Sequence, residues 1–397
     1  MKNKERELAH IEVIHDIQPI PGADNIDKAK VLGWDLIVKK GEFQEGDMCV
    51  FFEIDSKLPE DEWSKFLEPK GYKVKIYKLS KFGVWSEGLA LPVQSIPELA
   101  TGDFYEGQGV TDLLKVTYSV AEDNVRKKGD PDAKYKAMAA RRPSLFKKKP
   151  IRWLMKRSWG KKLVFFLFGR KKDNPRKFPD WITKSDETRV ESIPFILGNG
   201  IEYQLSEKLD GTSSTYGLKR LKKGKNRYEF YVCSRNVRLN DPEQATYHEY
   251  MSNRQDKYNI YWANAFKYDI KEHMIEYMNA NKNLDWMYIQ GESIGSVQGN
   301  PYKLNEDDLY VFNFVTSEEG RFPSVKGKYI IDSWGMKWVP LLGIETLPAD
   351  MESMKLLADG KSVINPKVDR EGIVYRGLDG KESFKNVSRK YLLKHQQ

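Results

Sequence analysis

The chain has 397 residues, with 66 Lys or Arg against 57 Asp or Glu, a formal net charge of +9 and only two cysteines. This length suggests about two domains. Cys49 and Cys233 form neither a disulfide framework nor a metal-ligand spacing. The charged start runs into no long apolar stretch, so neither a signal peptide nor stable membrane association is expected. We therefore expect a reducing location, cytoplasmic or otherwise intracellular.

The first part of the chain has the pattern of a small β domain. Strands are predicted over residues 31–40, 48–54 and 73–79, separated by turn residues such as Pro21, Gly22, Gly41 and Gly46. Several short strands with Gly-containing turns favour a barrel or sandwich. We predict an OB-like β-barrel over residues 1–111.

The basic charge is concentrated in one segment. Residues 141–177 contain fifteen Lys or Arg and one acid, Asp173, so the remainder of the chain is net acidic. The segment belongs to a predicted connector over residues 112–178. Three interpretations remain open: a basic arm on nucleic-acid phosphates, an interfacial membrane helix, or a solvated connector whose apolar stripe packs on a domain.

The residues Lys208-Leu209-Asp210-Gly211 are the one segment whose types imply a reaction. Residues 201–206 alternate between apolar and polar, which predicts a half-buried strand that ends near Lys208. A lysine amine in a pocket lined by other cations can lose its proton near neutral pH and attack a phosphate. Gly211 would let the backbone approach phosphate closely. A similar run, Leu378-Asp379-Gly380, lacks the lysine and is predicted to be a turn between two strands.

Three later strands carry further candidates. Residues 286–292 end in Glu292, residues 309–315 carry Phe312, and residues 371–376 begin with Glu371 and are followed by Lys385 beyond the turn. Helices are predicted over residues 242–254, 262–270 and 273–281. The fold class is therefore α+β, with a domain of antiparallel sheets and flanking helices over residues 179–397.

The order of these motifs resembles the covalent nucleotidyltransferases, which comprise DNA ligases, RNA ligases and mRNA capping enzymes. By this resemblance Lys208 is the adenylated nucleophile, Glu371 helps to hold a divalent metal, magnesium or manganese, and Arg235 contacts the nucleotide or an RNA phosphate. The remaining expected nucleotide contacts are Glu207, Asp210, Gly211, Glu292 on the ribose, Phe312 stacked on the purine and Lys385 on the α-phosphate.

The last motif departs from the superfamily pattern. It is often Lys-x-Lys, whereas here it is Ser383-Phe384-Lys385, and the sequence leaves open whether Arg389 or Lys390 supplies the missing charge. Only twelve residues follow Lys385, so no C-terminal OB module, as in DNA ligases and capping enzymes, is expected.

Other segments resemble one particular family, the fifth family of ATP-dependent RNA ligases, which has an N-terminal OB module. The resemblance lies in residues 20–26, 38–43, 52–56 and 86–92, and in residues 178–179 and 184–189 upstream of Lys208. It implies that the protein uses ATP to seal a 3′-OH RNA end to a 5′-phosphate at a nick in duplex nucleic acid. The OB module would bind RNA, and the protein would act as a monomer.

Two alternatives remain. A capping-type guanylyltransferase would use the same lysine chemistry with GTP, although the missing C-terminal OB module argues against it. A non-catalytic RNA-binding protein with a decayed ligase fold is favoured only by Ser383, whereas intact Lys208, Glu292 and Glu371 argue against it.

Overall fold

The computed structural model describes residues 7–118, 151, 154, 164, 177–221, 227–242 and 259–395. Its contacts divide the chain into one unit formed by Met1–Ser119 with Arg176–Gln397 and a second unit, Val120–Pro175. Nearly all of the basic segment, and most of the helix expected over residues 242–254, lie outside the described residues. None of the helices in the described part is long and apolar enough to cross a membrane.

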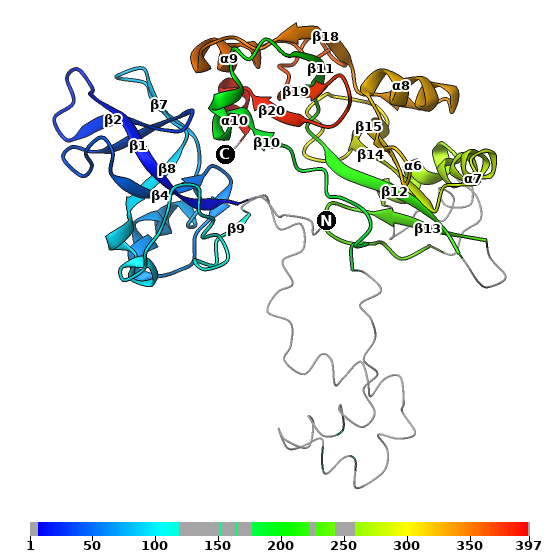
Figure 1. The fold of residues 1–397 in the computed structure, drawn as a ribbon, viewed down its shortest axis with the longest axis horizontal. Helices are drawn as coiled ribbons and strands as arrows, with labels where there is room; N and C mark the ends of the chain where they lie inside the picture. Colours follow the sequence, from blue (N-terminus) through cyan, green and yellow to red (C-terminus); the bar gives the residue numbers. More distant parts are fainter. Residues whose placement is uncertain are drawn as a thin grey trace. The chain divides into compact units, whose positions relative to one another are not determined.

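The N-terminal domain is an OB-fold, as the turn pattern predicted. Five antiparallel strands follow one another across the sheet in the order β3-β2-β1-β4-β8. The long first strand pairs with β4 through Ala9–Val13 and with β2 from Ile14 onward, and a bulge at Asp16 interrupts the pairing with β2. The strands are β1 (Ala9–Pro19), β2 (Ile26–Val31), β3 (Trp34–Lys39), β4 (Met48–Glu53) and β8 (Gly88–Pro92) (Figure 1).

Two predicted strands of this domain were wrong in their bounds. Of residues 73–79, only Tyr77–Leu79 forms a strand, β6. Residues 31–40 are not one strand, because β2 ends at Val31 and β3 begins at Trp34 opposite it, with Leu32 and Gly33 as a two-residue turn. Leu32 has a positive φ of 50°, as a tight hairpin turn requires. The smaller elements of the domain are β5 (Ser56–Lys57), η1 (Glu62–Lys70), β6 (Tyr77–Leu79), β7 (Val84–Ser86), η2 (Val93–Ser95), η3 (Pro97–Leu99) and β9 (Thr117–Tyr118).

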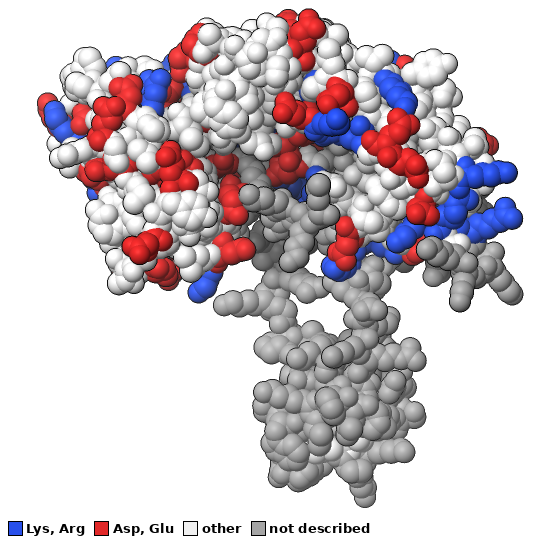
Figure 2. All heavy atoms as spheres, viewed as in Figure 1, with Lys and Arg blue, Asp and Glu red and all other residues white. Residues whose placement is uncertain are grey.

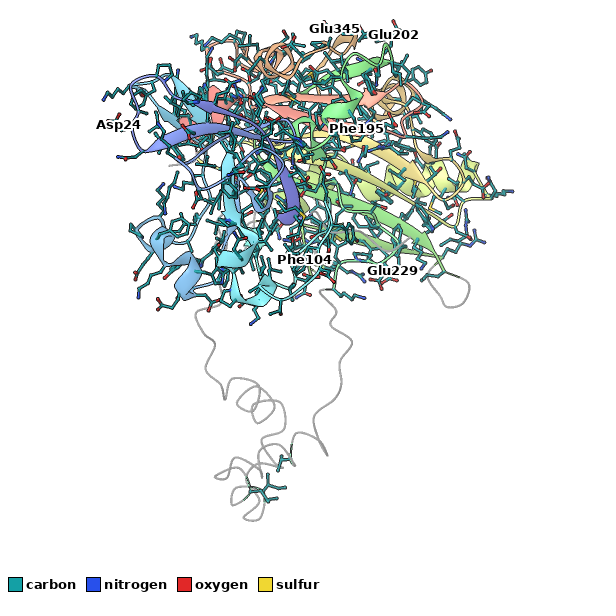
Figure 3. The ribbon with its side chains drawn as sticks, turned by 60° about the vertical axis from the view of Figure 1, so that its left-hand side comes forward. Asp24, Phe104, Phe195, Glu202, Glu229 and Glu345 are labelled. Carbon is teal, nitrogen blue, oxygen red and sulfur yellow. The ribbon has the colours of Figure 1, made fainter. Side chains whose placement is uncertain are left out.

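The C-terminal part contains two sheets. The first has the order β10-β20-β19-β11-β18, and its strands are β10 (Thr188–Arg189), β20 (Ser383–Val387), β19 (Gly372–Gly377), β11 (Glu202–Lys208) and β18 (Leu341–Thr346). Strand β11 pairs with β19 along one edge and β18 along the other. Its residues 203–207 are all buried, so both of its faces are covered and the expected half-buried pattern was wrong. Glu202 and Glu345 mark the end of the β11–β18 pair that lies away from Lys208 (Figure 3).

The second sheet has the order β13-β12-β14-β15-β16, with β17 also paired to β15. Its strands are β13 (Tyr228–Cys233), β12 (Thr212–Arg220), β14 (Trp286–Ile294), β15 (Asp308–Thr316), β16 (Gly320–Arg321) and β17 (Lys337–Trp338). Helices α6 (Ile260–Lys267) and α7 (Ile270–Ala280) contact this sheet, and α8 (Ser324–Ser333) contacts β15 (Figure 1). Apolar side chains of the sheet and these helices form one large core.

The helix predicted over residues 273–281 is confirmed within α7. The stretch predicted over 262–270 is interrupted, because α6 ends at Lys267 and Asp269 adopts a positive φ of 42° before α7 begins. The remaining elements are η4 (Val190–Ser192), η5 (Pro194–Ile196), α9 (Met351–Leu357) and α10 (Arg389–His395). The α+β fold class is confirmed.

A buried ionic cluster joins the N-terminal domain to the C-terminal helices. Lys355 of α9 lies 2.6 Å from Glu87 and 3.2 Å from Asp35, and Arg389 of α10 lies 2.6 Å from Glu87 and 2.5 Å from Asp35. Burial alone would raise the pKa of Glu87, yet the two cations hold it below its usual range. The cluster therefore keeps four charges ionised away from water.

Apolar contacts reinforce the same junction. Val387 and Leu392 belong to the core cluster that includes Trp34 and Phe51 of the N-terminal domain. Gly33 donates its backbone N–H to the carbonyl oxygen of Glu191 at 2.8 Å, and a Cβ on Gly33 would lie only 2.9 Å from that oxygen. Close backbone approach thus accompanies the ionic contacts.

We expect Lys355→Ala to lower the free energy of unfolding by about 3 kcal/mol, because it leaves buried carboxylates with too little positive charge. Urea denaturation followed by Trp fluorescence measures the change. Lys361→Ala is the matched control, since Lys361 pairs with Asp369 at the surface, and it should cost less than about 1 kcal/mol. Equal effects of the two substitutions would contradict the proposed importance of the buried cluster.

Candidate active site

The Lys-x-Asp-Gly turn carries the chain from one sheet to the other. Strand β11 ends at Lys208 in the first sheet, and β12 begins at Thr212 in the second. Gly211 is needed at the crossing, because a Cβ there would lie 2.3 Å from the carbonyl oxygen of Ser293 in β14. The sequence had suggested phosphate approach as the reason for this glycine, whereas the close packing of β14 already requires it.

Lys208 is held by a carboxylate. Its Nζ lies 2.6 Å from Oε1 of Glu371, which immediately precedes β19. Burial alone would lower the pKa of Lys208, but Glu371, together with Glu292 and Asp210, outweighs burial and raises the pKa above its usual range. The expected cation-lined pocket that deprotonates Lys208 is therefore wrong for this state, in which the amine is an ammonium.

The carboxylates around Lys208 are suited to a cation. Burial raises the pKa of Glu371, and burial with the charges of Glu371 and Asp210 raises that of Glu292 to about 8. Oε2 of Glu371 is buried and has no hydrogen-bond partner within the described part of the chain. No group of three or more metal-ligating side chains exists among the described residues. A divalent metal that takes one carboxylate and completes its shell with water and phosphate oxygens fits this arrangement.

A single carboxylate connects two of the predicted phosphate contacts. Asp186 lies 3.0 Å from Nζ of Lys385 and 3.2 Å from a guanidinium nitrogen of Arg235. The guanidinium of Arg235 also lies over the ring of Tyr118, 4.5 Å from its centroid. Asp186 therefore brings Lys385 of the first sheet and Arg235, which follows β13 of the second sheet, to one point.

Glu187, the residue after Asp186, likewise pairs with two basic side chains, both of them arginines. Its Oε1 lies 3.5 Å from both Arg321 and Arg376. Arg376 in turn donates a 2.5 Å hydrogen bond to the carbonyl oxygen of Phe312. Burial lowers the pKa of Arg376 to about 10, a value that keeps it charged at neutral pH. Arg376 thus links β19 of the first sheet with β15 of the second.

The charge missing at Ser383 comes from neither of the two residues suggested by proximity in sequence. Arg389 is bound to Glu87 and Asp35, and Lys390 lies 2.8 Å from Asp359. The residue directly opposite Ser383 in the β19–β20 pair is Arg376. Because paired residues project to the same face, Arg376 places a cation beside the position of the absent lysine.

The remaining predicted contacts lie nearby on the two sheets. Phe312 is half-buried and lies at an irregularity in the β14–β15 pairing. Glu207 is almost fully buried, and its Oε2 accepts a 2.8 Å hydrogen bond from the backbone N–H of Val363. Burial raises the pKa of Glu207, and its Oε1 has no hydrogen-bond partner among the described residues.

Two tyrosines that the sequence analysis missed hold Asp210. The Tyr391 hydroxyl donates a 2.7 Å hydrogen bond to Oδ2 of Asp210, and the Tyr302 hydroxyl accepts a 2.7 Å hydrogen bond from its backbone N–H. Both tyrosine side chains are buried. Tyr391 is 181 residues from Asp210 in the chain, so no local pattern could have linked them.

An OB-fold joined to two sheets, with a Lys-x-Asp-Gly turn between those sheets, is the architecture of a covalent nucleotidyltransferase. Family models agree with this class: residues 8–93 match an OB-fold domain and residues 201–392 match RNA ligase. Together these two matches support an RNA ligase that combines an OB-fold domain with a nucleotidyltransferase domain.

Solved structures of an RNA ligase from Naegleria gruberi are similar over the whole chain. The complex with PPi is 29% identical with a TM-score of 0.72, and covers 98% of this chain and 99% of the Naegleria chain. A variant with ATP and Mn is 27% identical with a TM-score of 0.72, and covers 98% of both chains. A variant with AMP and Mn is 27% identical with a TM-score of 0.71, and covers 98% and 99%. No curated protein sequence is a significant match.

We expect Tyr391→Phe to slow transfer of AMP to the protein by about tenfold. The substitution removes one hydrogen bond to a charged group, which is worth about 1.5 kcal/mol or more, and retains the ring. Single-turnover labelling with α-labelled ATP measures the rate. Tyr228→Phe is a matched control, because its hydroxyl bonds Asn279 at the exposed end of the sheet. A wild-type labelling rate in a folded Tyr391→Phe variant would show that Tyr391 does not position Asp210 for the reaction.

Proposed function

We propose that this RNA ligase uses ATP to join a 3′-OH RNA end to a 5′-phosphate at a nick in duplex nucleic acid. The observation that carries the proposal is the pairing of Lys208 with Glu371 at the end of β11, beside the two basic residues held by Asp186. The Naegleria ligase, solved with ATP and Mn, supports ATP and a divalent metal as the requirements.

In the first step, the neutral amine of Lys208 attacks the α-phosphorus of ATP. A P–N bond forms, the bond to the β-phosphate oxygen breaks, and pyrophosphate leaves. Because the pKa of Lys208 is raised by Glu371, the ammonium must lose its proton before it attacks. A divalent cation bound to Glu371 would favour the neutral amine by competing for the carboxylate, and would neutralise phosphate charge.

The other residues bind and orient the nucleotide. Lys385 and Arg235 exchange their contact with Asp186 for phosphate oxygens, Phe312 stacks on the purine, and Glu292 binds the ribose. Asp210, held by two tyrosines, orients the nucleotide at the turn, while Glu207 and Gly211 line the same turn. These roles are implied by the resemblance to covalent nucleotidyltransferases, and the residue types and their placement on the two sheets support them.

Two further displacements complete the joining reaction. An oxygen of the RNA 5′-phosphate attacks the phosphorus of lysyl-AMP, the P–N bond breaks, and Lys208 regains a proton. The RNA 3′-OH then attacks the activated 5′-phosphate, loses its proton, and AMP leaves. Each step is an in-line displacement at charged phosphorus, so one set of cations serves all three.

We assign RNA binding to residues 1–111, a connecting role to residues 112–178 and adenylyl transfer to residues 179–397. The protein acts as a monomer without stable membrane association. An intracellular, reducing location is supported by Cys49 and Cys233, which are both free and buried.

Incubation with α-labelled ATP and manganese should leave an acid-stable, lysine-linked label on the protein. Lys208→Ala and Lys208→Arg should both abolish the label, because Arg does not lose its proton in proteins. The Lys361→Ala variant, which changes a surface lysine, should acquire the label as the wild-type protein does. Labelling from GTP in place of ATP would favour a guanylyltransferase, and no label from either nucleotide would indicate a binding protein.

The nick preference can be measured with synthetic duplexes. Sealing should require a ribose 3′-OH at the break and a complementary strand across it, and should fall by at least tenfold for the same ends without that strand. Denaturing gels separate substrate, adenylated 5′ end and product. Equal sealing of paired and unpaired ends would contradict the nick assignment while leaving the RNA ligase activity intact.

A further inference from the structure

The N-terminal domain is acidic as a whole. Residues 1–118 contain fifteen Lys or Arg and twenty-one Asp or Glu. Asp and Glu side chains are spread over the face of this domain visible in Figure 2, with few Lys or Arg between them. Most of such a surface repels phosphate, so a nucleic-acid contact needs a locally basic site.

One segment of the domain has that character. Between Glu68 and Glu87 the chain contains five lysines and no acid. Residues 70–86, which we call the lysine hairpin, include β6 and β7. No described side chain forms a salt bridge with any of these lysines, in contrast to Lys65 nearby, which pairs with Glu62 at 3.3 Å. The five are Lys70, Lys73, Lys75, Lys78 and Lys81.

The backbone of the lysine hairpin directs its cations outward. Val74 and Ile76 are buried in the domain, whereas the alternating Lys73 and Lys75 are partly exposed and Lys78 is exposed. Extended backbone sends alternate side chains to opposite sides, so the apolar residues anchor the segment while the lysines remain available.

Aromatic rings lie beneath three of the lysines. Nζ of Lys78 lies 5.1 Å from the ring centroid of Trp85, and Nζ of Lys70 lies 5.2 Å from that of Tyr77. Nζ of Lys81 lies 5.0 Å from the ring of Phe82. Cation–π contacts orient an ammonium without neutralising it, so each lysine retains its full charge for phosphate.

The position of the lysine hairpin in the barrel also suits a nucleic-acid ligand. It lies between β4 and β8, the fourth and fifth strands of the OB-fold, and this connection and the one between the first two strands bind oligonucleotides in OB-folds. The two connections are adjacent here, because a Cβ on Gly22, between β1 and β2, would lie 3.8 Å from the Phe82 ring. Asp24 lies on the same β1–β2 connection (Figure 3).

The lysine hairpin also adjoins the C-terminal helices. The guanidinium of Arg389 in α10 lies 5.8 Å from the ring of Trp85, and Glu87 follows β7 directly into the buried ionic cluster. A strand of RNA on the hairpin would therefore be anchored to the part of the structure that holds Tyr391 against Asp210.

We propose that the lysine hairpin binds the phosphate backbone of the RNA substrate near the break. This inference rests on the proposed function, because it identifies where the OB-fold domain contacts that substrate. Lysine contacts to phosphate release counterions, so they contribute a defined salt dependence and no base specificity.

The test uses the full-length protein and a fluorescent nicked duplex, with binding measured by anisotropy across a salt series. Lys78→Ala should reduce the slope of log K against log salt by about 1, and Lys75→Ala with Lys78→Ala by about 2. Affinity at fixed salt should fall several-fold. Lys65→Ala, which changes an exposed lysine of the same domain, should leave both quantities unchanged.

Labelling of Lys208 and the thermal midpoint should remain at wild-type values in all three variants, because none of these lysines contacts the site. An unchanged slope in the double variant, or an equal change in Lys65→Ala, would overturn the proposal. A double variant that binds RNA normally but has lost binding to anionic vesicles would overturn it as well. Failure of the wild-type protein to label or seal would refute the proposed function instead, and the binding series would still test the hairpin.

Discussion

Helix α10 is the constraint on which the arrangement of domain and site depends. Arg389, near its start, forms buried ion pairs with the N-terminal domain, Leu392 packs into that domain's core, and Tyr391 between them bonds Asp210 of the Lys-x-Asp-Gly turn. Successive residues of a helix point in different directions, so one short helix can meet three partners at once. The position of the OB-fold domain is thereby tied to the geometry of the nucleophile's own turn.

The second organising feature is the neutralisation of the site by its own carboxylates. Asp186 and Glu187 each hold two basic side chains, and Glu371 holds Lys208. Without these carboxylates, the neighbouring cations would repel one another strongly in a partly buried space. In the proposed function, Lys385 and Arg235 exchange their contact with Asp186 for phosphate oxygens, so the negative charge of phosphate replaces that of Asp186 beside them.

The sequence was sufficient for features that depend on local pattern and chain order. The strand ends that carry Lys208, Glu292 and Glu371 follow from short runs of residues, and the OB-fold follows from closely spaced turns. The sequence was insufficient where residues far apart in the chain come into contact. Tyr391 carries no local signal, and residues 184–189 resembled the family without indicating that Asp186 pairs with Lys385 and Arg235. The direction of the pKa shift of Lys208 depends on Glu371, which lies 163 residues further along the chain. Leu32 concealed a turn, because an apolar residue with positive φ gives no turn signal.

The net charge of the whole chain also conceals how charge is distributed within it. The net charge of +9 suggests a basic protein, yet the OB-fold domain is acidic, and five of its lysines occupy one stretch without acids. Screening confines exposed charges to a range of about 8 Å at physiological salt, so a phosphate on the lysine hairpin experiences those lysines much more strongly than acids across the barrel. The acidic remainder then repels the strand from other faces of the domain. An acidic domain with one basic edge therefore restricts where RNA can bind more tightly than a uniformly basic domain would.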